Sequence, residues 1–277
     1  MKRKIPVQRL CEKTGMSRQN LYQARRARQV RVVDEDLIEA LVREERRMQP
    51  RLGGRKLYHL LHAELAAAGV RIGRDRFFKV LERKGLLVDR LPKAPRTTDS
   101  RHSLGVFGNR FKDLELTGPD HAWVSDITYV ATDEGYLYLS LITDAWSRKI
   151  VGYHGGDTLE TEGCLRALAM AVAVLPEGRT PMHHSDRGSQ YCSHLYIGQL
   201  RAHGLGISMT EERHCYENAL AERVNGILKQ EYSLSGRFRS KSQALESIHE
   251  AVRLYNTRRP HTAIKFQTPE RAHRQVV

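Results

Sequence analysis

Apolar positions at helical spacing dominate the first part of the chain. Val7, Leu10 and Cys11 precede a turn at residues 14–16, and Ser17 is suited to cap a second helix that contains Leu21. This pattern favours a helix-turn-helix whose second helix enters the major groove of DNA, although a plain helical hairpin has the same pattern. The predicted DNA-contacting side chains of the second helix are Arg18, Gln19, Asn20, Gln23, Arg25 and Arg26.

Three further apolar stripes predict a second small helical module. The stripes comprise Leu37, Ile38, Leu41 and Val42, then Leu57, Leu60, Leu61 and Leu65, then Phe77, Phe78, Val80 and Leu81. Residues 50–54 and 69–73 contain the Pro and Gly residues that break the pattern between them. A basic, Pro-rich segment without periodicity begins near Leu91 and is typical of a linker.

From Ala122 the pattern changes to short β-prone runs. Residues 123–130, 136–143 and 149–153 are separated by turn sequences and predict an antiparallel meander. Helices are then expected over about 159–175, 193–203, 218–232 and 241–256, with strands over 181–184 and 206–210. Three antiparallel strands followed by alternating helix and strand predict an α/β fold of the ribonuclease-H-like class, preceded by small all-α modules.

The expected domain organisation follows from these changes of pattern. It consists of a helix-turn-helix-like segment at 1–33, a second helical module at 34–89, a basic linker at 90–117, a ribonuclease-H-like core at 118–232 and a basic helical tail at 233–277.

Composition excludes several classes of protein. A hydrophobic content of 40% over 277 residues is typical of a soluble globular protein. No apolar run approaches the roughly 18 residues of a membrane-spanning helix, and no secretory signal opens the chain, so we expect a cytoplasmic, nucleoid-associated protein. The four scattered cysteines lack the paired spacing of a zinc site.

The net charge of +14 is unevenly distributed. Residues 1–116 hold 28 Lys and Arg against 14 Asp and Glu, residues 117–232 hold 9 against 15, and residues 233–277 hold 9 against 3. Basic flanks suit DNA phosphates, and an acidic middle suits a site that collects carboxylates around cations, although a charge run can equally be a solvated face.

Three acids stand out in the acidic middle. Asp126 interrupts a β-prone run, Asp186 directly follows a short strand, and Glu222 lies on a predicted helix. On that helix a polar stripe contains Asn218, Glu222, Asn225 and Lys229. Phosphoryl transfer at a DNA strand needs two metal ions about 3.5–4 Å apart, and carboxylates are the ligands that such hard cations prefer. Each acid alone could also be an ordinary surface or turn residue.

Taken in order, the motifs around these acids resemble insertion-sequence transposases. They are Asp-Ile-Thr-Tyr at 126–129, His-Ser-Asp-Arg-Gly-Ser-Gln-Tyr at 184–191, Asn-Ala-Leu-Ala-Glu-Arg at 218–223, Tyr-Asn-Thr-Arg-Arg-Pro-His at 255–261 and Thr-Pro-Glu at 268–270. They are most similar to the IS-three family, in the product of its second reading frame, which carries a retroviral-integrase-like core. In that family 35 residues separate the second Asp from the Glu, as they separate Asp186 from Glu222 here. The resemblance covers about residues 35–275.

The resemblance implies roles for individual residues. Asp126, Asp186 and Glu222 would be the catalytic metal ligands, and Lys229 would contact the DNA end. Glu217-Asn218 stands where the family usually has Asp-Asn, which leaves open which glutamate lies nearest the metals, although spacing favours Glu222. Surrounding side chains that we expect to orient a ligand or water are His184, Gln190 and Asn218, and Arg258 and Arg259 are expected to bind phosphate.

The implied activity is cleavage of the element's ends and joining of the 3′-hydroxyl to another strand, with two Mg²⁺ ions per site, for which Mn²⁺ can substitute. The implied partners are the terminal inverted repeats and target DNA, other copies of this chain bridging two DNA ends, and a product of an upstream reading frame. A nuclease of the ribonuclease-H type and a non-catalytic repressor descended from a transposase are the alternatives.

Overall fold

The computed structural model describes residues 8, 11, 15–89, 104–211 and 218–275. The chain divides into two compact units: Met1–Arg47 with Gly53–Val88, and Met48–Leu52 with Asp89–Val277. In the part of the chain that the structure describes, no helix has the length and apolar character needed to cross a membrane.

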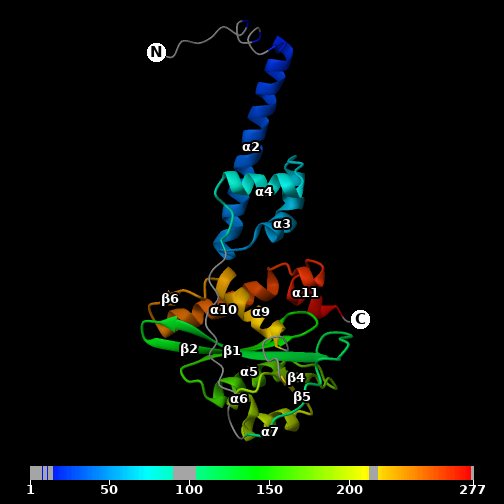
Figure 1. Ribbon diagram of the computed structural model, residues 1–277, viewed down its shortest axis with the longest axis vertical. Helices are drawn as coiled ribbons and strands as arrows, with labels where there is room; N and C mark the ends of the chain where they lie inside the picture. The colour runs from blue at the N-terminus through cyan, green and yellow to red at the C-terminus, as the bar shows by residue number, and fades with distance from the viewer. Residues whose placement is uncertain (1–7, 9–10, 12–14, 90–103, 212–217, 276–277) are drawn as a thin grey trace. The chain divides into compact units, whose positions relative to one another are not determined.

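The regular secondary structure in the described part of unit 1 is helical. Its long helix α2 (Arg18–Met48) lies beside α3 (Gly54–Ala67) and α4 (Arg74–Arg83), and its N-terminal half extends beyond them (Figure 1). The predicted apolar stripes supply the buried side chains Ile38, Val42, Leu57, Leu61, Leu65, Phe77, Val80 and Leu81. Ion pairs from Arg83 to Glu35 and from Lys84 to Asp36 and Glu39 connect α4 to α2.

The predicted cap of the long helix is present, because Ser17 Oγ accepts a hydrogen bond from the Asn20 backbone N–H. Helix α2 then continues without a break across residues 33 and 34, where a boundary between two modules was expected. The second helix of the expected helix-turn-helix and the first helix of the next module are therefore one helix. The first helix of that motif, around Val7 and Leu10, lies outside the described residues.

Unit 2 is built on a six-stranded mixed sheet. Strands β1 (Ala122–Thr132), β2 (Gly135–Asp144) and β3 (Ile150–Gly156) form the predicted antiparallel meander. Strand β4 (Met182–Ser185) pairs parallel with β1, and β5 (Gly206–Met209) pairs parallel with β4, which gives the order β3-β2-β1-β4-β5. A short strand, β6 (Arg237–Phe238), pairs parallel with the end of β1. The predicted ribonuclease-H-like fold class is confirmed.

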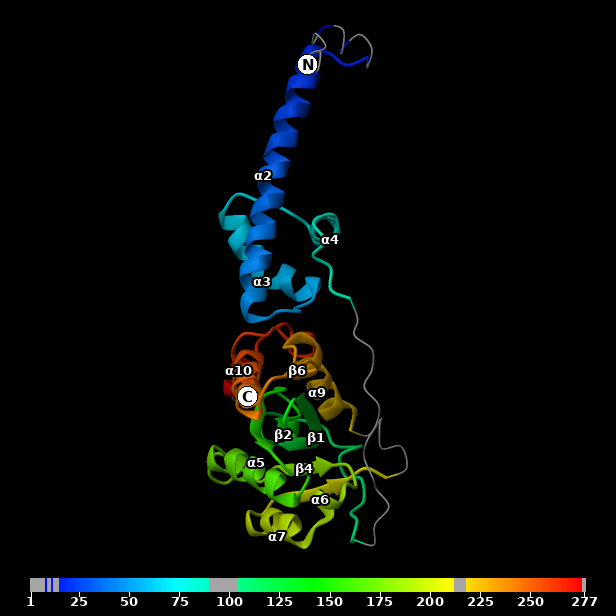
Figure 2. The same cartoon turned by 90° about the vertical axis from the view of Figure 1, so that its left-hand side faces the viewer.

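Helices cover both faces of this sheet. One face carries α5 (Thr161–Ala173), α6 (Ser189–Cys192) and α7 (His194–Ala202), and the other carries α9 (Ala219–Glu231), α10 (Lys241–Thr257) and α11 (Pro269–Arg274), as Figures 1 and 2 show. Each face has its own apolar core because alternate residues of a strand point to opposite sides. Helix α6, strand β6, helix α11 and a 3-10 turn at Thr262–Ile264 have no counterpart in the sequence prediction. They are too short to give a periodic signal.

Among the described residues, no strand pairs with β1 along part of one edge. On that side it pairs with β4 only through Ala122–Val124 and with β6 only through Ala131 and Thr132. Polar side chains take the place of a strand in between. The Asn218 side-chain amide donates to the Ser125 carbonyl oxygen at 3.0 Å, and the Ile127 N–H donates to the Asp126 carboxylate at 2.9 Å.

Close approach of α5 to β3 requires a glycine at position 152. A Cβ built there would lie 2.1 Å from the Ala167 carbonyl oxygen, which is backbone and cannot rotate away. We therefore expect Gly152→Ala to lower the free energy of unfolding by about 3 kcal/mol.

Chemical denaturation would measure this loss, with Gly198→Ala in the middle of α7 as the matched control. A Cβ added at Gly198 would meet no atom within 4 Å outside the helix's own backbone. The control should leave stability unchanged or raise it by about 0.5–1 kcal/mol, because alanine favours a helix interior. Equal effects of the two substitutions would contradict the packing described for β3 and α5.

Candidate active site

The three acids singled out in the sequence come from three different elements of unit 2. Asp126 lies in β1, Asp186 follows the end of β4, and Glu222 lies in the first turn of α9. Burial raises the pKa of Asp126 to about 7, and the charge of Asp186 contributes to this rise, with a smaller contribution from Glu222. The fold therefore brings three carboxyl groups close enough to interact, across 96 residues of sequence.

Two neutral groups hold the Asp126 carboxylate in place. The Asn225 side-chain amide donates to Oδ2 at 2.7 Å, and the Ile127 N–H donates to Oδ1. Both bonds favour the ionised form, but they only partly offset the effect of burial and of the neighbouring acids on the pKa.

The predicted polar stripe of α9 faces the open edge of β1. Asn218 binds the backbone of Ser125, Asn225 binds Asp126, and the Lys229 ammonium lies 4.3 Å from the centre of the Tyr129 ring. Burial lowers the pKa of Lys229, and the Asp126 carboxylate acts in the opposite direction. Asn218 thus supports the strand that carries Asp126, and Lys229 lies beside the acids.

A tight turn orients Asp186. Its Oδ1 accepts a hydrogen bond from the Gly188 N–H at 3.0 Å. An added Cβ at Gly188 would lie 3.1 Å from both Asp186 Oδ1 and Gln190 Oε1, which places the Gln190 amide beside this carboxylate. The Gln190 amide nitrogen donates to the Leu159 carbonyl oxygen at 2.7 Å, so the residue also ties the loop before α5 to the site.

A cavity of about 420 Å³ adjoins the acids. Its wall contains Asp126 and Asp186, and its other lining residues are Ile127, Thr128, Tyr129, Tyr136, Tyr138, Leu159, Gly188, Ser189, Gln190 and Tyr191. The cavity wall therefore combines two carboxyl groups with the side chains of four tyrosines.

His184 does not line this cavity. Its ring is fully buried, its Nδ1 lies 2.9 Å from Ser208 Oγ, and it stacks on Phe111 at 4.9 Å between ring centres. The neighbouring His183 is also buried, and burial lowers its pKa to about 3, so it is neutral between Ser125 and Tyr196. These contacts fix β4 against its surroundings, whereas orientation of a ligand by His184 stays a prediction.

The structure corrects the expectation for Arg259. This side chain is only 2% exposed and pairs with both carboxylate oxygens of Glu231, at 2.8 and 2.9 Å, so it is not a surface phosphate ligand. The sequence held a signal for this. Val252, Tyr255 and Arg259 follow one another at steps of three and four, and the first two are buried. Arg258 is exposed, as expected of a phosphate contact.

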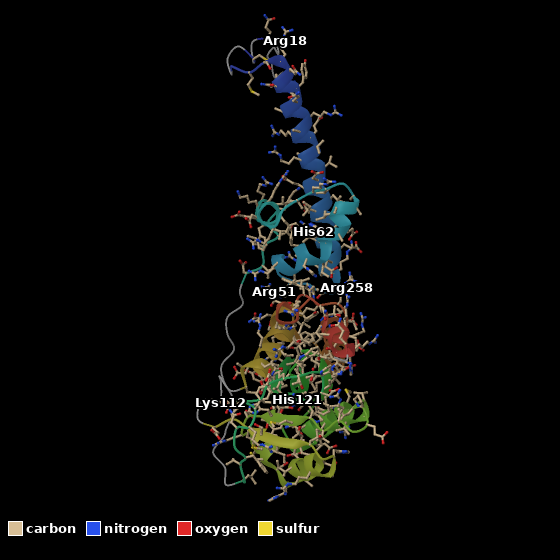
Figure 3. All side chains as sticks on the ribbon, turned by 90° about the vertical axis from the view of Figure 1, so that its right-hand side faces the viewer. Arg18, Arg51, His62, Lys112, His121 and Arg258 are labelled. Atoms are coloured by element: carbon tan, nitrogen blue, oxygen red, sulfur yellow. The ribbon has the colours of Figure 1, made fainter. Side chains whose placement is uncertain are left out.

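The DNA-contacting residues expected near the N-terminus all lie in unit 1. Arg18, Gln19, Asn20, Arg25 and Arg26 are exposed on the extended half of α2, and Figure 3 shows Arg18 at the start of that helix. Between Arg18 and Val33 the helix carries five arginines and no acid. Such a segment has a strongly positive surface.

A second cluster of possible metal ligands comprises Asp120, Asp144 and His273. The Asp144 carboxylate accepts hydrogen bonds from the backbone N–H groups of Asp120 and Ser147, and Asp120 accepts one from the Trp123 indole. His273 lies 3.5 Å from Asp120 and 3.7 Å from Asp144. These bonds satisfy the carboxylates and tie α11 to the turn after β2, so the cluster is structural.

Sequence reasoning left Asn225 and the tyrosines out of the site. Asn225 could have been found, because it shares the polar stripe with Glu222 and lies three residues after it. Tyr136 and Tyr138 alternate on one face of β2, and Tyr138 pairs with Tyr129, but only the register of β1 and β2 brings them together.

Ionised Asp126 should destabilise the metal-free protein. Its pKa is raised from 3.8 to about 7, so the cost is absent below about pH 4, grows as the pH rises towards 7 and is complete above 7. We expect Asp126→Asn to raise the free energy of unfolding by about 1–3 kcal/mol at about pH 8 and by almost nothing at about pH 4.

Urea unfolding in EDTA at several pH values measures this difference. Asp113→Asn, at an exposed position, is the control and should stay within about 0.5 kcal/mol of the parent. A gain for Asp126→Asn that does not depend on pH would mean that the charge of Asp126 is not its cause.

Comparison with known proteins shows which family the chain belongs to. Residues 117–215 and residues 203–269 match two family models, each described as an integrase core domain. The insertion element IS600 uncharacterized 31 kDa protein of Shigella sonnei is 37% identical over 211 residues, which span 76% of this chain and 78% of that protein. Transposase InsF for insertion sequence IS3A of Escherichia coli (strain K12) is 33% identical over 209 residues, which span 75% and 73%.

Among solved structures, a chain of the simian T-cell lymphotropic virus intasome in complex with PP2A regulatory subunit B56 gamma aligns with a TM-score of 0.50 at 19% identity. The alignment covers 81% of this chain and 75% of that chain and supports the fold. Together with the identity to the two insertion-sequence proteins, these matches show that the chain belongs to the IS3 family of insertion-sequence transposases and that unit 2 contains an integrase core of the Asp-Asp-Glu polynucleotidyl transferase type.

Proposed function

We propose that this chain cleaves the ends of an insertion sequence and joins the exposed 3′-hydroxyl to another DNA strand, with Asp126, Asp186 and Glu222 as the catalytic metal ligands. One observation carries the proposal: the Asp126 carboxyl on β1 is buried, and its pKa is raised by this burial first and then by the charges of Asp186 after β4 and Glu222 on α9. Carboxylates collected in this way are stabilised when divalent cations lie between them.

The donor set fits magnesium. All three candidate ligands are carboxylates, which Mg²⁺ and Mn²⁺ prefer, and the nitrogen and sulfur ligands that favour zinc are absent from the described cavity wall. When bound, a pair of such ions supplies activation of the attacking oxygen and stabilisation of the leaving oxygen.

The remaining side chains position the reactants. Asn225 holds Asp126 in one orientation, the Gly188 N–H holds Asp186, and Asn218 holds β1 next to Asp126. Lys229 places a cation beside the acids, where it can pair with a phosphate oxygen that does not react. The site has no need of a serine or tyrosine nucleophile, because water and then the 3′-hydroxyl attack phosphorus directly.

DNA binding extends beyond the acids. The exposed arginines of α2 form a positive helix that suits a DNA groove or backbone, and Arg258 adds a phosphate contact in unit 2. Two DNA ends must meet for transposition, so we propose that copies of this chain bridge them. Cooperation with the product of an upstream reading frame belongs to the same proposal.

Glu222→Gln tests the catalytic assignment. The change removes a charge from an exposed position on α9, so folding and DNA binding should persist while cleavage of a duplex copied from the element's inverted repeat falls by at least about 100-fold. The assay measures nicked and joined strands with Mg²⁺ or Mn²⁺.

Glu246→Gln on α10 is the control and should cut like the parent chain. Undiminished cleavage by Glu222→Gln would sink the assignment. Nicking without joined products by the parent would favour a nuclease, and binding without cleavage in the presence of the upstream product would favour a repressor.

The role of α2 is tested by the salt dependence of DNA binding. Replacement of Arg18, Arg25 and Arg26 by alanine removes three exposed cations, so the slope of log K against log salt should become less steep by about 2.7. Fluorescence anisotropy at several salt concentrations gives this slope. Arg166→Ala, which removes an exposed arginine paired with Glu162, is the control, and an equal slope for the triple variant and the parent would exclude α2 from the interface.

A further inference from the structure

Three tyrosines form an aromatic wall directly beside the acids. Tyr129 and Tyr138 are cross-strand partners on β1 and β2, and Tyr136 precedes Tyr138 by two residues on the same face. The rings of Tyr129 and Tyr136 meet edge to face, with 5.4 Å between their centres. Tyr136 remains 52% exposed.

This wall and the acids line one cavity. Asp126 and Asp186 line the 420 Å³ space together with Tyr129, Tyr136, Tyr138 and Leu159. Ser189 and Gln190 add hydrogen-bonding groups near Asp186. A strand whose phosphate lies at the acids would therefore have a neighbouring nucleotide within reach of the aromatic rings.

We propose that the cavity receives a nucleobase displaced from the duplex next to the phosphate that reacts. This inference rests on the proposed function, because the acids determine where the strand lies. A cavity of this volume is in the range of about 300–1,000 Å³ found for small-molecule sites and is large enough to hold a single base. Displaced bases stack on aromatic side chains, and this stacking tolerates any base because each has a π-face.

The position of Lys229 supports this arrangement. Its ammonium lies over the Tyr129 ring, so one side chain of α9 is near both the aromatic wall and the acids. A cation at this point can hold the phosphate that links the displaced base to the reacting one. The cavity thereby assigns a function to the exposed ring of Tyr136, which neither metal binding nor core packing uses.

The test is a thermodynamic cycle between one ring and one base. The full chain carrying Glu222→Gln keeps the DNA intact, and its affinity for the inverted-repeat duplex is measured by anisotropy with Mg²⁺. Tyr136→Leu removes the ring, and Tyr136→Phe keeps it. Each is titrated with the intact duplex and with duplexes that lack a single base at successive positions around the cleavage site.

Stacking predicts that Tyr136→Leu binds the intact duplex about tenfold more weakly, whereas Tyr136→Phe stays within about twofold of its parent. At one position the loss caused by Tyr136→Leu should vanish when that base is missing, because ring and base then act as a pair. An equal loss at every position, or the same loss for Tyr136→Phe, would overturn the stacking site.

Cleavage by the chain with native Glu222 is recorded separately on the same duplex. Cleavage without coupling between Tyr136 and any base overturns the inference and leaves the proposed function intact. Coupling without cleavage supports the base site and counts against the catalytic proposal. Thermal unfolding of both Tyr136 variants confirms that each is folded.

Discussion

The burial of the Asp126 carboxyl near two other acids is the constraint on which the candidate site of unit 2 depends. A carboxylate is destabilised both by removal from water and by nearby charges of the same sign, and the pKa of Asp126 is raised by burial first and by the charges of Asp186 and Glu222 after it. Asp126 lies on the part of β1 whose edge pairs with no strand among the described residues. Backbone groups of β1 are therefore available there for hydrogen bonds with side chains such as Asn218. Hydrogen bonds from the neutral Asn225 amide and Ile127 N–H partly stabilise the ionised Asp126 carboxylate, and bound divalent cations would stabilise it further.

Helix α9 supplies the support that the open edge needs. Its polar stripe binds β1 at Ser125 and Asp126, while its apolar residues pack into the core with α10. Its last residue, Glu231, receives both guanidinium bonds from buried Arg259. Removing one partner of a buried pair costs about 3–5 kcal/mol, so this contact fixes the end of the helix firmly. The side chains that face the acids are therefore held from a rigid element.

Charge is divided between the two units in a way that matches their proposed tasks. Unit 1 carries an exposed arginine-rich helix, which we propose contacts DNA, whereas residues 117–232 have a net negative charge, which suits the proposed binding of cations. A strand that approaches the acids must overcome their charge. We propose that Lys229, which lies over the Tyr129 ring, and the tyrosines of the cavity wall, which need no charge to bind a base, favour a nucleic acid at this point.

The sequence by itself determined the strands and helices that have several turns or alternations, and with them the fold class. It also determined the three acids, because their motifs and the 35-residue interval between Asp186 and Glu222 need no structure to be seen. Only the tertiary structure decided which side chains lie next to these acids. Arg258 and Arg259 are chemically alike in sequence, yet packing buries the second against Glu231 and leaves the first exposed. Tyr129 and Tyr136 meet because strand register joins distant positions, and register is a property of pairing that a local pattern does not contain.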